Sequence, residues 1–246
     1  MYMKKGCLSG SLLKMIAFIT MAIDHVAASV LMILKRTNET AAFIYPYMRH
    51  IGRIAFPIFI FELVEGFMHT KNKGKYALRL FVFSLIAEVP FDLAFFQTPC
   101  TFEYQNVIIT MFIGFLAMWG LSAADEKIAG RSLLFYYLSR AGIIVLSVLA
   151  GFYTRCDYSY MGVLAIILGY VFRSHPFPVF RNLTPVMICL VLVLSNPKSE
   201  IWCLFALPFL YLYSGKKGKM NKWISYGFYP GHLFLLYLIL QKLSLL

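Results

Sequence analysis

Charged residues are scarce in this sequence: 14% of its 246 residues are Asp, Glu, Lys or Arg, against about 25% in typical soluble domains. Long polar stretches are lacking as well, so no segment would hold a separate soluble domain. Hydrophobic residues make up 60% and aromatic residues 17% of the chain. Apolar runs of about 17 to 25 residues, long enough to span a bilayer, recur throughout. We therefore expect an all-α, polytopic transmembrane bundle that forms a single domain over residues 1–246.

Several motifs are also absent. The five cysteines show no C-x-x-C spacing, which argues against a zinc site or a redox motif. No H-E-x-x-H or similar spacing occurs, so no metal is expected. The N-terminus lacks a small-residue cleavage site, so the first apolar run is expected to remain as a membrane helix. Cys100 and Cys156 fall in loops on the same predicted side, and a disulfide between them stays an open question.

About nine membrane helices are predicted from the apolar runs. Their ranges are 12–35, 50–69, 76–96, 105–123, 133–152, 158–173, 183–195, 200–214 and 223–241. The run 183–195 is short for a span. Residues 183–214 therefore form either two spans or one bent hairpin.

The net charge of +12 is concentrated at helix ends, as the positive-inside rule requires, and not in a basic stripe suited to nucleic acid. The N-terminal segment and every second loop carry Lys4, Lys5, Lys14, Lys71, Lys73, Lys75, Arg79, Lys127, Arg131, Arg173, Arg181, Lys216, Lys217, Lys219 and Lys222. The alternate loops carry few basic residues. This asymmetry predicts a multi-pass protein of the cytoplasmic membrane, with its N-terminus inside and its C-terminus outside.

Ionisable residues occur inside the predicted spans. A charge at the bilayer centre costs about 2.5–3.5 kcal/mol, so such residues are functional candidates. At 1.5 Å per residue, Asp24 and His25 lie about 18–20 Å from the inner end of their helix, Glu88 about 18 Å and His232 about 14 Å. Three helices thus place a histidine or a carboxylate near one depth.

Two ion pairs are expected from the same estimate of depth: Arg53 with Asp92, and Glu65 with Arg79. Each pair would either fasten helices or belong to a binding site. Asp24 and His25 are neighbours and point about 100° apart on a helix. Asp24 is therefore expected to meet an arginine or the substrate, while His25 carries the proton.

Seven motifs in order along residues 12–240 resemble the TraX family of conjugal-transfer membrane proteins. They include IDH at 23–25, GRIAFPIF at 52–59, EVPFDL at 88–93 and YGFYPGHL at 226–233. The family is named for an enzyme that acetylates the N-terminus of the major conjugative pilin. The positions that match its polar pattern are Asp24, His25, Arg53, Glu65, Arg79, Glu88, Asp92, Asn106, Tyr229 and His232.

The resemblance implies an acyltransferase that uses acetyl-CoA as donor and a peptide or another small molecule as acceptor. We expect His25 to be the general base, with Asp24 and His232 also catalytic. His232 or Tyr229 would donate to the oxyanion and Asn106 would position the acceptor. The acceptor site would comprise Arg53, Glu65, Glu88, Asp92, Asn106 and Tyr229. Arg79, Lys71 and Lys75 would bind the phosphates of the donor.

A transporter or channel for a small solute is the rival interpretation, because buried charges also serve as relays. A third is a membrane scaffold for a surface-assembly complex. A transporter is expected to show repeats or helices broken at Gly or Pro in matching halves, and the sequence indicates neither. An enzyme is expected to have a basic cytoplasmic mouth that leads to His25.

Overall fold

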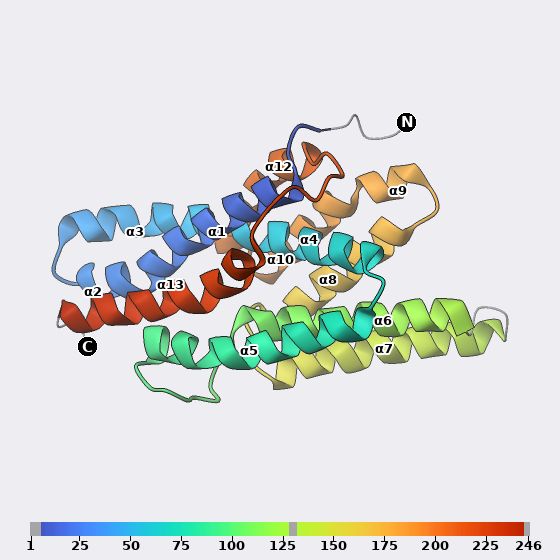
Figure 1. Ribbon diagram of the computed structural model, residues 1–246, viewed down its shortest axis with the longest axis horizontal. Coiled ribbons are helices and arrows are strands. Elements are labelled where there is room, and N and C mark those ends of the chain that lie inside the picture. The colour runs from blue at the N-terminus through green and yellow to red at the C-terminus, as the bar shows by residue number, and fades with distance from the viewer. Residues whose placement is uncertain (1–5, 128–131, 244–246) are drawn as a thin grey trace.

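The computed structural model describes residues 6–127 and 132–243 and is shown in Figure 1. Lys4, Lys5 and Arg131 lie outside the described residues, as do the side chains of Lys127 and Lys222. In the described ranges every regular element is a helix, apart from isolated bridges between Leu8 and Tyr213 and between Gln105 and Cys156. The predicted all-α class is confirmed.

The helices follow one another from α1 to α13. They are α1 (Gly10–Val26), the π-helical turn η1 (Ala27–Leu31), α2 (Met32–Leu34), α3 (Glu39–Gly52), α4 (Ala55–His69), α5 (Lys73–Phe96), α6 (Val107–Lys127), α7 (Leu133–Tyr153), α8 (Ser159–Ser174), α9 (Pro178–Asn182), α10 (Thr184–Ser195), α11 (Pro197–Glu200), the 3₁₀ turn η2 (Ile201–Ala206), α12 (Leu207–Tyr211) and α13 (Lys222–Lys242). Asn38 and Asn72 begin α3 and α5, where each side chain accepts a hydrogen bond from a backbone N–H of the first turn.

Most predicted helices are present with bounds within four residues of the expected ones. Helix α3 is absent from the predicted helices, because residues 36–49 contain polar residues and Pro46 and read as a loop. Helices α3 and α4 form one broken element, interrupted at Arg53 and Ile54 just after Gly52. Residues 183–214 form a helical hairpin, in which α10 packs against α11, η2 and α12.

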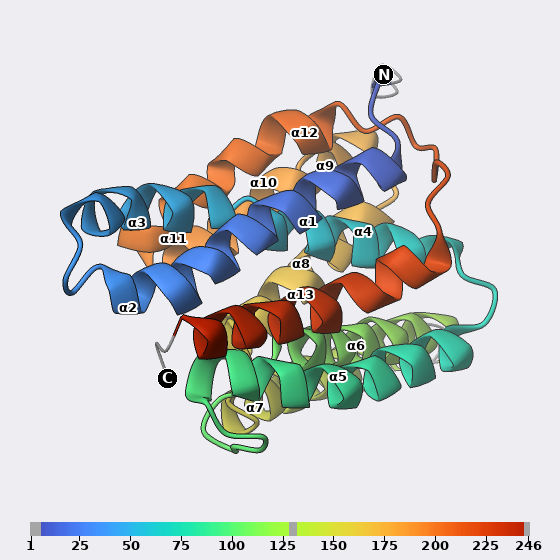
Figure 2. The same ribbon diagram turned by 60° about the vertical axis from the view of Figure 1, so that its left-hand side comes forward.

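Helix α8 is the centre of the packing, since it contacts α4, α6, α7 and α10. Phe115, Ile166 and Ile188 are among the fully buried side chains of the core. Helices α5, α6 and α7 run side by side (Figure 1). Helix α13 lies between α1 and α5 and contacts both (Figure 2). The last helix of the chain is thereby brought against the first.

Three helical segments are long and apolar enough to cross a bilayer: Gly10–Leu34, Val107–Glu126 and Leu133–Tyr153. Ser159–Ser174 and Thr184–Ser195 are shorter apolar helices. The apolar window of α7 has no buried residue, and Leu138 and Leu146 are 61% and 70% exposed. Soluble monomers rarely expose apolar patches of this extent. The chain is a membrane protein, while nine spans and the orientation of the termini stay predictions.

Candidate functional site

His25 and His232 lie side by side. Nδ1 of His25 is 2.7 Å from Nε2 of His232, and the rings stack with centroids 5.0 Å apart. Their helices α1 and α13 belong to opposite ends of the chain. These two histidines, predicted to lie near one depth, are in direct contact.

The hydrogen bonds assign the tautomers of the histidine pair. The carbonyl oxygen of Phe228 can only accept, so Nδ1 of His232, 2.7 Å away, donates to it. Nε2 of a neutral His232 is then an acceptor, and Nδ1 of His25 donates to it. Nε2 of His25 is left as an unprotonated acceptor. This is the nitrogen that can take a proton from a substrate.

Aromatic rings hold the pair in place. Phe228 stacks on His232 with centroids 5.0 Å apart, and the Phe95 and Tyr229 rings contact the His25 ring edge-on, at centroid distances of 5.4 and 6.0 Å. Edge-on and stacked ring contacts have preferred geometries, so these neighbours restrict the orientation of both imidazole rings. Tyr229 is a better candidate than His232 for donating a hydrogen bond to an oxyanion, because both ring nitrogens of His232 already take part in hydrogen bonds.

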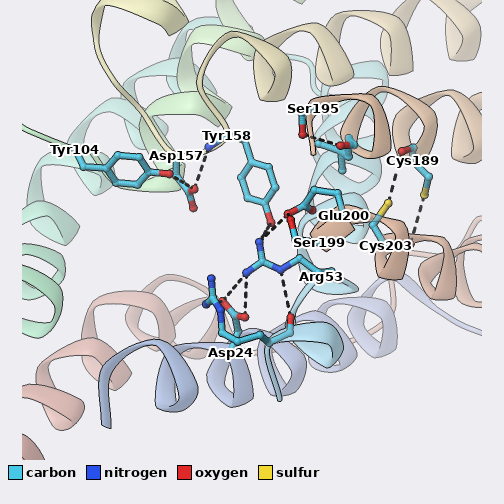
Figure 3. A network of polar contacts seen from close by, with 12 residues as sticks. Asp24, Arg53, Tyr104, Asp157, Tyr158, Cys189, Ser195, Ser199, Glu200 and Cys203 are labelled. Carbon is cyan, nitrogen blue, oxygen red and sulfur yellow. Dashed lines mark hydrogen bonds and ion pairs between the residues drawn. The ribbon is translucent and has the colours of Figure 1, made fainter. Parts of the chain in front are cut away.

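A chain of charges lies next to His25. Asp24 is 2.7 Å from Nη1 of Arg49 and 3.0 Å from Nη2 of Arg53. Nη1 of Arg53 is 2.9 Å from Oε1 of Glu200 and donates to the Tyr158 hydroxyl at 3.4 Å. Figure 3 shows Arg53 between Asp24 and Glu200. The expected arginine partner of Asp24 is confirmed.

The close approach of α1 to the broken helix requires Gly52. A Cβ atom at this position would lie 2.2 Å from Oδ1 of Asp24, so a side chain would displace the carboxylate. The interruption after Gly52 directs Arg53 toward Asp24 on one side and Glu200 on the other. The predicted pair of Arg53 with Asp92 is wrong: Asp92 is buried and accepts a hydrogen bond from the backbone N–H of Thr101.

Asp157, in the loop between α7 and α8, supplies another carboxylate. Its Oδ1 accepts hydrogen bonds from the Tyr104 hydroxyl at 2.7 Å and from the Tyr158 N–H at 2.9 Å (Figure 3). Burial raises the pKa of the Asp157 carboxyl above its usual value, although the hydrogen bond from Tyr104 and the charge of Arg53 act in the opposite direction.

Asp24, His25, Arg53 and Asp157 line a cavity of about 310 Å³. We call it the arginine cavity, and its polar lining consists of Asp24, His25, Arg49, Arg53, Tyr104, Asp157 and Tyr158. Its volume is within the range of about 300–1,000 Å³ typical of ligand sites. Apolar side chains of α1, α4, α5 and α6 form the rest of its wall, together with small residues such as Gly52.

A second cavity, of about 740 Å³, lies along the same helices. We call it the lysine cavity because its lining includes Lys14, Lys71, Arg79 and Lys217. Glu62 and Glu65 line it as well, and Glu62 lies 3.5 Å from Nζ of Lys14. Glu65 pairs with Arg173 from α8. The predicted pair of Glu65 with Arg79 is therefore wrong.

One face of α1, continued by η1, connects the two cavities. Gly10, Lys14 and Phe18 line the lysine cavity, whereas Asp24 and Ala28 line the arginine cavity. From Gly10 to Ala28 this face extends about 27 Å along the helix axis, close to the thickness of a bilayer core of about 30 Å. The two cavities therefore lie one after the other along the length of a single apolar helix.

Other predicted site residues lie elsewhere. Asn106 is fully buried and lines neither cavity. Its amide donates to the Ser84 carbonyl and to the Glu88 carboxylate, and its Oδ1 accepts from the N–H of Ile108. It has no donor left for an acceptor molecule and serves to begin α6. Glu88 is committed to Asn106 and is not part of the histidine pair. Lys71, Lys75 and Arg79 are all exposed, but only Lys71 and Arg79 line the lysine cavity.

Four residues that line the arginine cavity were not predicted, namely Arg49, Tyr104, Asp157 and Tyr158, and neither was Glu200, which pairs with Arg53. Arg49 belongs to a helix that was taken as a loop, and its spacing of four from Arg53 is the signal that places both on one face. Tyr104, Asp157 and Tyr158 lie in loops between helices, and Glu200 ends the short helix α11, so depth along a spanning helix does not locate them. Cys100 and Cys156 are both free thiols. Among the described residues, no three His, Cys, Asp or Glu side chains are grouped to hold a metal ion.

The model of the TraX protein family matches residues 9–240. The chain belongs to the TraX family. It is 30% identical to the probable fimbrial assembly protein FimC, serogroup H1, of Dichelobacter nodosus, in an alignment covering 91% of this chain and 92% of that protein. No solved structure matches the chain. The matched range of the TraX family contains both histidines and the whole of both cavities.

Proposed function

We propose that this TraX family member is a membrane-embedded acyltransferase that moves an acetyl group from cytoplasmic acetyl-CoA to an amine or hydroxyl acceptor. The observation that carries the proposal is the histidine pair. A hydrogen-bonded chain from Phe228 through His232 leaves Nε2 of His25 unprotonated, in the lining of a ligand-sized cavity. A positioned imidazole in this state is suited to general base catalysis at neutral pH.

The chemistry assigned to His25 is one proton transfer in each direction. As the acceptor nitrogen or oxygen bonds to the thioester carbon, Nε2 of His25 takes its proton. The carbon–sulfur bond then breaks, and the same proton passes from His25 to the CoA thiolate. Nδ1 of His25 stays bonded to His232 throughout, so the ring does not turn. The products are the acetylated acceptor and free CoA.

The lysine cavity suits the donor. Acetyl-CoA carries phosphates and a long flexible arm, and the cations of Lys71, Arg79 and Lys217 line the cavity where they would bind its phosphates. The face of α1 leads from these cations to His25. This arrangement matches the basic mouth that an enzyme of this kind requires. Tyr229 lines the lysine cavity next to His25, where its hydroxyl would stabilise the developing oxyanion.

The arginine cavity is proposed to receive the acceptor. The relative in Dichelobacter nodosus is named as a fimbrial assembly protein, which favours a pilin-like peptide or another surface-destined molecule. Asp157 and Arg49 offer a carboxylate and a guanidinium for the ends of such an acceptor. The donor would then enter the lysine cavity from one face of the membrane, and the acceptor would enter the arginine cavity from the opposite face.

Transfer of a radiolabelled acetyl group in proteoliposomes tests the proposal. Purified protein is supplied with labelled acetyl-CoA on one side and with a panel of peptide amines and hydroxyl compounds on the other. We expect a labelled acceptor to form with wild type and not with His25→Ala. Uptake of a solute without covalent labelling, unchanged by acetyl-CoA, would instead favour the transporter.

A further inference from the structure

Three apolar side chains line both cavities: Met21 on α1, Phe59 on α4 and Val107 at the start of α6. They come from three helices that are remote in sequence. They lie where the lining of the lysine cavity meets the lining of the arginine cavity. Met21 is 6% exposed, and Phe59 and Val107 pack against the same apolar cluster. We call these residues the apolar passage.

The apolar passage has a fixed position relative to the histidine pair. Met21 precedes His25 by one turn of α1, about 6 Å along the axis. Phe59 contacts Phe18, whose ring stacks on Phe228 with a centroid distance of 4.4 Å. Phe228 in turn stacks on His232. A continuous series of rings therefore links the passage to the atoms that orient His25.

We propose that Met21, Phe59 and Val107 form the passage for the pantetheine arm of the donor and restrict the transferred acyl group to acetyl. This inference rests on the proposed function. A thioester that reaches His25 through the passage has its acyl group directed into the arginine cavity, toward Asp24 and Arg53. An acetyl group is short enough to stop beside His25. A longer chain has to either displace the passage side chains or contact the ion pair of Asp24 and Arg53.

The expected size of the effect follows from the chemistry of apolar pockets. One methylene in such a pocket changes the specificity constant by about 10-fold to 200-fold. Shortening Phe59 or Met21 opens space for additional methylenes. The variants Phe59→Ala and Met21→Ala should therefore raise the ratio of kcat/KM for butyryl-CoA to that for acetyl-CoA by at least about 10-fold.

The experiment uses full-length protein in proteoliposomes with acetyl-, propionyl-, butyryl- and hexanoyl-CoA. Phe59→Leu and Met21→Val accompany the alanine variants, because a milder change preserves folding where alanine does not, and they should give a smaller shift in the same direction. Phe112→Ala is the matched control. Phe112 is a half-buried phenylalanine that lines neither cavity, so its loss should leave the acyl preference unchanged.

The outcomes separate the two proposals. An acyl preference that shifts toward longer chains in the passage variants and not in Phe112→Ala supports the passage. If every folded passage variant keeps the wild-type ratio of kcat/KM for butyryl-CoA to that for acetyl-CoA, the proposed passage is overturned and the proposed acyltransferase activity is not. Failure of wild type to transfer any acyl group overturns both.

Discussion

Nδ1 of His25 and Nε2 of His232 are 2.7 Å apart, although the two residues are separated by 207 positions in the chain. The contact depends on α13 packing against α1 and α5. Because the second nitrogen of His232 is tied to a carbonyl of its own helix, the direction of both hydrogen bonds is determined. The proton-accepting nitrogen of the proposed site is therefore set by a helix at the far end of the sequence.

Removal of His25 should abolish turnover while preserving the fold. Proton transfer by a positioned side chain contributes about 10²–10⁴ in rate, so His25→Ala and His25→Gln should both lose measurable acetyl transfer. Glutamine retains a hydrogen bond to His232 and cannot cycle a proton. Binding of a non-hydrolysable acetyl-CoA analogue should stay near wild type. Near-normal turnover of His25→Gln would reduce His25 to a positioning role.

His232 is expected to position His25 and not to exchange the substrate proton itself. His232→Gln can still accept from Nδ1 of His25, whereas His232→Ala cannot. Acetyl transfer by His232→Ala should fall by about 10²-fold, at the lower end of the range for acid–base catalysis, and His232→Gln should recover a large part of it. Equal activity of the two variants would show that the hydrogen bond between the histidines does not matter for turnover.

Arg53 should be needed for stability. Arg53→Ala leaves Glu200 without its cation and removes one of the two cations of Asp24. Breaking a buried ion pair in this way costs about 3–5 kcal/mol, so expression and thermal unfolding temperature should both decrease. Arg49→Ala is the control, because the Arg49 side chain is 32% exposed and Asp24 keeps Arg53. An Arg53→Ala protein with wild-type stability and no activity would instead indicate direct contact with substrate.

Asp157 should make stability fall as pH rises. Burial raises the pKa of its carboxyl in the folded protein above the value of the unfolded chain. Between these two pKa values the folded state binds more protons than the unfolded state, so the free energy of unfolding decreases with increasing pH. Asp157→Asn should remove this part of the slope in unfolding temperatures measured from pH 4 upward. An unchanged slope would mean that Asp157 does not contribute to it.

The orientation of the chain is open to direct labelling. With about nine spans and the N-terminus inside, Leu243→Cys after α13, in a variant whose five native cysteines are replaced by serine, should react with an impermeant maleimide added outside intact cells. Lys219→Cys, in the exposed loop before α13, should react only after permeabilisation. The reverse pattern would mean either that the N-terminus is outside or that the number of spans is even, and in the second case the hairpin of α10 to α12 would be the first segment to reconsider.

Membrane class and helix bounds were largely predictable. Apolar runs of spanning length have few alternatives to a helix in a bilayer, because every backbone polar group has to be satisfied within the segment. Helix α3 escaped prediction because its residues are mixed and it includes Pro46. Its place is decided by packing against α1, where Gly52 allows contact with Asp24.

The candidate site was predictable in part. Depth along a helix placed His25, His232 and Glu88 at one level, and the two histidines do meet, whereas Glu88 binds Asn106. The rotation of about 100° between Asp24 and His25 correctly suggested that Asp24 would meet an arginine. Depth alone could not choose among partners at the same level, so Arg53 was assigned to Asp92 and Glu65 to Arg79. Rotation of each helix about its axis decides which carboxylate an arginine faces, and rotation depends on contacts between helices that a single sequence does not display.

What the amino-acid sequence by itself determined is the helical membrane class, most helix positions and the residue types available for proton transfer, because these depend on local composition and period. The tertiary structure alone decided that Phe228 and His232 orient His25, that Arg53 bridges Asp24 and Glu200, and that two cavities meet at Met21, Phe59 and Val107. Each of these contacts joins helices remote in sequence. Their geometry arises from packing, which is a property of all the helices together.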